Sequence, residues 1–125
     1  MYSVSVENYG DMKFHATARD GGFVMAVNGG GANPVETLLA GLCGCVGHYV
    51  RDFLDERKAA CKSFTVKGEA RQTQDRTRLD GIDLFLDLKG MRFGDEEEEA
   101  LLKCVEKCKL HNTLKMGCDI RLVLV

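Results

Sequence analysis

The sequence predicts an α+β fold built around one long helix. Short runs rich in β-branched and aromatic residues open the chain, a long uncharged helical stretch occupies its centre, and a second helix with further strand-like runs follows. The expected order is three strands, a helix, two strands, a helix and a closing strand. Since the first three strands follow one another without a helix between them, antiparallel sheets are favoured. A length of 125 residues predicts a single domain over residues 1–125.

The opening strands are expected at residues 2–8, 12–18 and 23–28. Glycine-containing turns separate them, Tyr9-Gly10-Asp11 and Asp20-Gly21-Gly22. Alternating strand-like runs and short turns of this kind predict an antiparallel meander.

The central helix has clear start signals. Asn33 is placed as the N-cap, Pro34 suits the first helical position, and Glu36 can complete a capping box. The helix is expected to run to about Lys58. Its first half is apolar on every side, while its second half alternates charged and apolar residues, so it begins in the interior and ends at the surface.

The stretch LAGLCGCVGHYV, residues 39–50, places three glycines inside this helix. Each glycine costs roughly 1 kcal/mol relative to alanine in a helix interior, so the helix surface must gain from close approach of another element. A chain of this length can hardly cover an apolar, glycine-rich helix by itself. We therefore expect a second copy to supply part of the cover.

The second half of the chain returns to alternation. Residues 61–90 predict two strands joined by a polar connection, and Asp95 is expected to cap a second helix. Four glutamates, residues 96–99, follow this cap, where the helix dipole favours negative charge, so they mark a helix start rather than a metal site. Apolar positions up to Cys108 continue at helical spacing, and Ile120–Val125 alternates as the closing strand.

Charge and composition exclude several classes of partner. The formal net charge is −2, without a basic stripe for nucleic acid or a polybasic segment for a membrane. The longest uncharged stretch, residues 37–50, is too short and too rich in glycine to span a bilayer. No leader-like segment is recognised, so a cytoplasmic protein is expected.

Six cysteines are many for this length, and a reducing compartment favours catalytic, metal-binding or buried thiols over disulfides. On a helix, Cys43 and Cys45 project about 200° apart and cannot bind one metal ion together. Cys43 is expected to point into the core with Val46 and Val50. Cys45 is expected on a more polar face, together with Leu38, Gly41, His48, Tyr49 and Asp52.

Three interpretations remain open for Cys104, Cys108 and His111. The cysteines can be core residues at helical spacing, the three side chains can be metal ligands, or one cysteine can pair with the thiol of the central helix. Cys61 and Cys118 flank expected strands and are most simply buried.

Together these residues resemble the OsmC/Ohr family of thiol-dependent hydroperoxide reductases. The resemblance rests on Pro34-Val-Glu followed by Leu-Leu-Ala-Gly and Cys45, and on Cys108 within C-K-L-H-N-T-L before the final run. It covers nearly the whole chain in order and spacing. It implies an intertwined α+β homodimer, with the central helices packed together and two active sites between the subunits.

The resemblance also implies roles for single residues. Cys45 matches the peroxidatic cysteine, Cys108 the resolving cysteine, and Arg19 the arginine that holds the peroxidatic thiolate. An acidic residue follows the proline in the organic-hydroperoxide branch, whereas this chain has Val35 there, and Lys109 stands where proline commonly follows the second cysteine. The remaining pocket residues are expected to be Glu36, His48, Tyr49 and His111.

The leading hypothesis is a thiol-dependent peroxidase that reduces hydrogen peroxide or organic hydroperoxides in defence against oxidative stress. Its expected partners are a second copy, the peroxide and a thiol reductant of unknown identity, with no metal and no cofactor. The alternative is a non-catalytic, thiol-rich protein that binds a metal or a small electrophile at the same interface. The two hypotheses differ in whether Cys45 reacts catalytically with peroxide or only takes part in binding.

Overall fold

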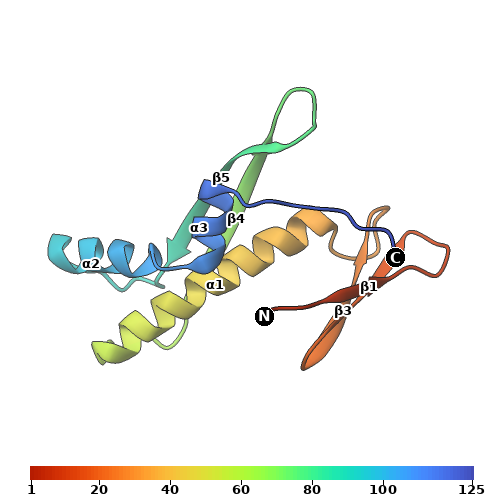
Figure 1. The fold of residues 1–125 in the computed structure, drawn as a ribbon. Helices are drawn as coiled ribbons and strands as arrows, with labels where there is room; N and C mark the ends of the chain where they lie inside the picture. Colours follow the sequence, from red (N-terminus) through yellow and green to blue (C-terminus); the bar gives the residue numbers. More distant parts are fainter. The chain divides into compact units, whose positions relative to one another are not determined.

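The computed structural model describes residues 1–125 and shows an α+β fold with antiparallel sheets and one long helix (Figure 1). The chain divides into two compact units, residues 1–40 and residues 41–125, here called the N-terminal and C-terminal units. The elements are β1 (Ser5–Glu7), β2 (Lys13–Ala18), β3 (Gly21–Ala26), α1 (Pro34–Glu56), β4 (Thr65–Gln72), β5 (Leu79–Asp87), α2 (Asp95–Val105) and α3 (Lys109–Met116).

The N-terminal unit contains the expected antiparallel meander, in the order β1-β2-β3. Arg19 and Asp20 form the tight turn between β2 and β3, because Ala18 pairs with Gly21. Gly22 has to be a glycine, since a Cβ there would lie 2.4 Å from the backbone oxygen of Ala16. Strands β1 and β2 are shorter than the sequence predicted, while β3 has the predicted length but begins two residues earlier.

Helix α1 begins as the sequence predicts. The side chain of Asn33 accepts the backbone N–H of Glu36 at 2.8 Å, and the carboxylate of Glu36 accepts the backbone N–H of Asn33 at 3.0 Å. These two hydrogen bonds form a capping box. The helix ends at Glu56, close to the predicted end at Lys58, which has a positive φ of 51°. None of the three helices combines the length and apolar character that crossing a bilayer requires.

The core of the C-terminal unit lies between α1 and the β4–β5 hairpin. The hairpin is antiparallel, as predicted, and its partly buried side chains pack against the apolar face of α1. Helix α2 contributes the buried Leu101, and Cys108 at the start of α3 belongs to the same core. The buried residues of α1 recur three or four positions apart, as one helix face requires: Leu42, Val46, Val50, Phe53 and Leu54.

The second predicted helix is interrupted. Helix α2 starts after Gly94, not after Asp95 as predicted, and ends at Val105; a separate helix, α3, begins after Cys108. Two bonds of the i to i−3 type tighten the end of α2, from Lys107 to Cys104 and from Cys108 to Val105. Cys108 then takes an extended conformation, with φ −63° and ψ 122°. The helical spacing from Cys104 to Cys108 therefore does not describe one continuous helix.

The predicted closing strand is absent. Residues 117–125 contain no regular secondary structure, and the apolar side chains of Ile120, Leu122 and Leu124 are exposed, that of Leu122 to 91%. A strand needs a neighbour for its N–H and C=O groups, and this chain pairs no strand with the segment. The alternating pattern is present, but its pairing partner is not.

The core predicts a sharp difference between two phenylalanines. Phe53 is 2% exposed and its ring packs edge-on against Phe93 at 5.8 Å, whereas Phe85 on β5 is 52% exposed. We expect Phe53→Ala to lower the free energy of unfolding by about 3–5 kcal/mol, and the control Phe85→Ala by about 1 kcal/mol or less. Urea unfolding followed by circular dichroism measures both. Equal losses would contradict the described core.

Candidate functional site

Two sulfur atoms from distant parts of the sequence meet in the C-terminal unit. The Sγ atoms of Cys108 and Cys45 lie 2.8 Å apart although the residues are 63 positions apart in the chain. The two thiols are not bonded to each other, since a disulfide bond is about 2.05 Å long. Oxidation of the pair therefore needs only a small movement of the sulfur atoms.

Close packing of α3 on α1 places these sulfur atoms. Gly41, one turn before Cys45, faces Leu110 of α3, and a Cβ there would lie at an ordinary van der Waals distance of 3.7 Å from Cδ1 of Leu110. Gly47 similarly faces Phe64 beside β4. Other elements pack against the helix at these two positions, but the contacts leave room for a Cβ, so the expectation that the glycines are required for close approach is not confirmed. Gly44 meets no atom within 4 Å.

The predicted facing of the two α1 thiols needs correction. Cys43, expected in the core, is half-buried and lies outside the core cluster, although burial raises the pKa of its thiol. Cys45, expected on the polar face, is also half-buried but packs against the core. The difference arises because α3, which the sequence did not predict, covers the flank of α1 that carries Cys45.

Cys108 is the N-cap residue of α3. Its sulfur accepts the backbone N–H of His111 at 3.5 Å. Burial raises the pKa of the Cys108 thiol above its usual range and the bond to Cys45 raises it further, while the backbone N–H groups of His111 and Leu110 lower it in part. The net direction is upward, so Cys108 retains its proton near neutral pH.

The two thiols differ in exposure. Cys108 is fully buried, at 0%, while Cys45 is half-buried. Cys45 is therefore the more accessible of the two residues.

Three of the predicted pocket residues, His48, Tyr49 and His111, lie in the C-terminal unit, and His111 contacts the sulfur of Cys108. The exposed His48 lies 3.3 Å from the carboxylate of Asp52, and its ring contacts the ring of Tyr49. The ring of His111 faces the side chain of Asn112 at 3.2 Å, so His111 meets Cys108 through its backbone N–H rather than its imidazole.

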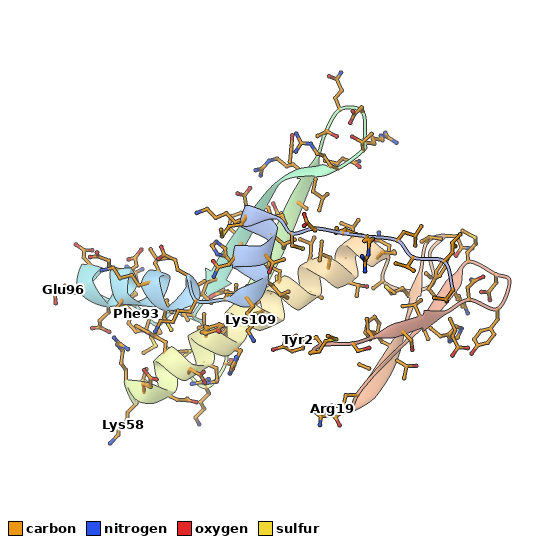
Figure 2. The ribbon with its side chains drawn as sticks, in the orientation of Figure 1. Tyr2, Arg19, Lys58, Phe93, Glu96 and Lys109 are labelled. Atoms are coloured by element: carbon orange, nitrogen blue, oxygen red, sulfur yellow. The ribbon has the colours of Figure 1, made fainter.

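Two other predicted residues lie in the N-terminal unit. Arg19 is at the tip of the β2–β3 turn (Figure 2), and the carboxylate of Glu36 is occupied by the capping box. The roles of Arg19 and Glu36 stay predictions.

The remaining thiols are held in different ways. Cys61 is buried and its thiol donates to the backbone oxygens of Ser63, at 3.2 Å, and Leu88, at 3.8 Å. The thiol of Cys104 donates to the backbone oxygen of Tyr49 at 3.7 Å. Cys118, expected to be buried, is exposed because it lies in the unpaired C-terminal segment.

The comparisons with known proteins decide the family. Residues 27–123 match the family model described as OsmC-like protein. The chain belongs to the OsmC-like family. An OsmC-like protein from Mycoplasma pneumoniae has a TM-score of 0.77 at 17% identity, covering 94% of this chain and 89% of that one. No curated protein sequence matches the chain.

Two structures with more specific names share the OsmC-like fold. The organic hydroperoxide resistance protein OhrB of Bacillus subtilis has a TM-score of 0.62 at 17% identity, covering 97% of this chain and 95% of that one. An organic hydroperoxide resistance protein from Legionella pneumophila has a TM-score of 0.61 at 18% identity, with coverages of 97% and 95%. At identities this low, the structural likeness shows the fold alone, and this is the fold that the sequence resemblance implied.

Two other candidate features of this OsmC-like chain are a metal site and a cavity. Cys104, Cys108 and His111 do not form a group that could hold a metal ion. A cavity of about 420 Å³ lies between the end of β5 and α2. No cysteine lines it; the lining side chains are Leu86, Leu88, Met91, Arg92, Phe93, Glu98, Leu101 and Leu102.

Sequence reasoning missed α3 and, with it, the backbone N–H groups that face Cys108. A signal for this helix is present in the sequence. Lys115 falls in its last turn, and Gly117 follows its end with φ 77° and ψ 169°, a conformation that favours glycine.

The raised pKa of Cys108 predicts how disulfide formation depends on pH. Attack on oxidised Cys45 requires the Cys108 thiolate, whose fraction rises about tenfold per pH unit below the pKa of the thiol. Because burial acts on Cys108 whatever the state of Cys45, we expect the rate to keep rising from about pH 7 to about pH 9. Acid quenching, alkylation and mass spectrometry measure it after a pulse of oxidant. A plateau below about pH 8 would contradict the raised pKa.

Proposed function

We propose that the protein is a thiol-dependent peroxidase that reduces hydrogen peroxide or organic hydroperoxides in defence against oxidative stress. The observation that carries this proposal is the 2.8 Å contact between the sulfur atoms of Cys45 and Cys108. Membership of the OsmC-like family supports it, as does the fold shared with proteins named for organic hydroperoxide resistance.

The reaction begins at the half-buried sulfur. The Cys45 thiolate attacks the outer oxygen of the hydroperoxide, so an S–O bond forms and the O–O bond breaks. The alkoxide leaves and takes a proton from water, while Cys45 becomes a sulfenic acid. The peroxide has then been reduced by two electrons and the sulfur oxidised by two.

The second step uses the buried sulfur. Cys108 loses its proton and attacks the sulfur of the Cys45 sulfenic acid, forming the disulfide and releasing hydroxide. An external thiol reductant, whose identity we leave open, then restores both thiols by exchange. Little movement is required, because the two sulfur atoms are already in contact.

We assign supporting roles to the other predicted residues. The guanidinium of Arg19 would stabilise the Cys45 thiolate, as the family resemblance implies. His48 and Tyr49 follow Cys45 by about one helical turn on α1 and would line the approach to it. His111 contributes its backbone N–H at Cys108, and Glu36 holds the start of α1. A cytoplasmic location, where thiol reductants are abundant, fits this chemistry.

A homodimer is part of the proposal. The C-terminal segment alternates in the manner of a strand but pairs with nothing in its own chain. A second copy that offers a strand edge would satisfy its backbone and cover its apolar side chains. Exposed apolar residues are found in both units: Phe23, Val24, Val35, Leu38, Ile120, Leu122 and Leu124.

The peroxidase proposal predicts distinct behaviour for three variants. Cys45→Ser should abolish peroxide consumption, while Cys108→Ser should complete one turnover and stop as a sulfenic acid that dimedone can trap. Arg19→Ala should slow the first step, since a thiolate without its cationic partner is less populated. Peroxide consumption with dithiol and monothiol reductants, together with mass spectrometry, measures all three. Cys118→Ser is the control, because this exposed thiol lies outside the core cluster that holds the pair.

Different results would reject different parts of the proposal. Full turnover in Cys45→Ser would reject the peroxidase itself. A wild-type first step in Arg19→Ala, with both thiols still required, would reject only the role of the arginine. Stoichiometric zinc that is lost in Cys108→Ser would instead support the non-catalytic metal-binding alternative.

The dimer proposal predicts that Leu122→Asp weakens assembly. Leu122 is exposed, and on a strand it shares a face with Ile120 and Leu124, so a carboxylate there would lie against apolar neighbours. The matched control Arg121→Asp exchanges one charged side chain for another on the opposite face. Light scattering should give twice the mass of one chain for the wild type and the control. A wild-type monomer at micromolar concentration would overturn the proposed assembly.

A further inference from the structure

A chain of hydrogen bonds leads from the start of α3 to the sulfur of Cys45. The backbone N–H of His111 donates to the sulfur of Cys108 at 3.5 Å, and the thiol of Cys108 donates to the sulfur of Cys45 at 2.8 Å. Cys108 is therefore an acceptor on one side and a donor on the other. The peroxidase scheme uses only its later attack and leaves this arrangement in the reduced protein without a role.

We propose that the Cys108 thiol activates Cys45 before any peroxide arrives, by donating its hydrogen to the Cys45 thiolate. Cys108 then acts in both halves of the reaction, first as a hydrogen-bond donor and later as a nucleophile. The inference rests on the proposed peroxidase function and adds a second task for one of its residues.

Burial determines which sulfur keeps the proton. Cys108 is 0% exposed and belongs to the apolar core, so its thiolate would lack water. Cys45 is half-buried and its thiolate would keep part of its hydration. The burial that raises the pKa of Cys108 acts in the same direction. Cys108 is therefore the sulfur that keeps its proton and can donate it.

The donor is held in place by α3. The backbone oxygen of Cys108 accepts the first helical hydrogen bond, from Asn112 at 3.0 Å, and its sulfur accepts the N–H of His111. These two contacts fix both ends of the cysteine. A hydrogen bond received by a donor polarises it, so the N–H of His111 strengthens the bond that Cys108 donates to Cys45.

The capping box occupies the carboxylate of Glu36, so this side chain is not free to orient an arginine beside Cys45. The carboxylate of Glu36 binds the backbone of Asn33 at 3.0 Å, and the position after Pro34 holds Val35, which has no charge. An arginine without a carboxylate to orient it is a less fixed partner for a thiolate. A buried donor in direct contact with Cys45 supplies stabilisation that does not depend on a flexible side chain.

The test compares Cys108→Ser with Cys108→Ala by the rate at which iodoacetamide alkylates Cys45. Serine retains a donor and alanine removes it. Loss of a hydrogen bond to a charged group should lower the thiolate population about tenfold, partly offset by a more nucleophilic sulfur. We therefore expect alkylation about threefold slower in the alanine variant at pH 7. At high pH, where Cys45 is ionised in both variants, the deficit should disappear.

The disappearance of the deficit at high pH distinguishes a lost hydrogen bond to the Cys45 thiolate from a structural change that makes Cys45 less accessible. A deficit that persists at high pH, or equal rates at pH 7, would overturn the proposal. Alkylation of the exposed Cys118 in the same samples is the internal reference, and circular dichroism checks that both variants fold. The assay contains no peroxide, so failure here leaves the peroxidase proposal standing, while full turnover in Cys45→Ser rejects that proposal independently.

A second measurement retains both thiols and covers the case in which the alanine variant does not fold. The infrared S–H stretching band of Cys108 is identified by its loss in Cys108→Ser. It should lie at lower frequency in the wild type than in Cys45→Ala, because only the wild type provides the sulfur acceptor. Identical frequencies would overturn the proposal.

Discussion

The packing of the apolar face of α1 sets the geometry on which the site depends. Leu42, Val46 and Val50 hold the helix against the hairpin and α2, and the same core includes Cys108 at the start of α3. Because packed side chains leave little freedom, the distance between α1 and α3 is set by this core. The contact between the two sulfur atoms follows from that distance, although their residues lie 63 positions apart in the chain.

The site departs from what local stability alone would select. Serine, threonine, aspartate and asparagine are the favoured N-cap residues, yet α3 is capped by the weaker acceptor of Cys108. Gly41 likewise costs the helix stability, although a Cβ there would make only an ordinary contact with Leu110, at 3.7 Å. Departures of this kind concentrate where function is located. Both of them lie within a turn or so of the sulfur contact.

Local signals were sufficient for much of the fold and insufficient for the rest. The capping box at Asn33 and the two antiparallel sheets depend on neighbouring residues and short turns, and the sequence predicts them. The break before Cys108 and the facing of Cys43 and Cys45 depend on how α3 packs, which no local pattern contains. The segment Ile120–Val125 has the pattern of a strand, but pairing needs a neighbour that the pattern cannot supply.

The carbonyl partners of Cys61 and Cys104 set these two thiols apart from the Cys45–Cys108 pair. Each donates its hydrogen to a backbone oxygen, Cys61 to Ser63 and Leu88, and Cys104 to Tyr49. The hydrogens of both thiols are thus directed to main-chain oxygens. Two thiols in and near the core are therefore held by the main chain, whereas Cys108 is held against a second sulfur, that of Cys45.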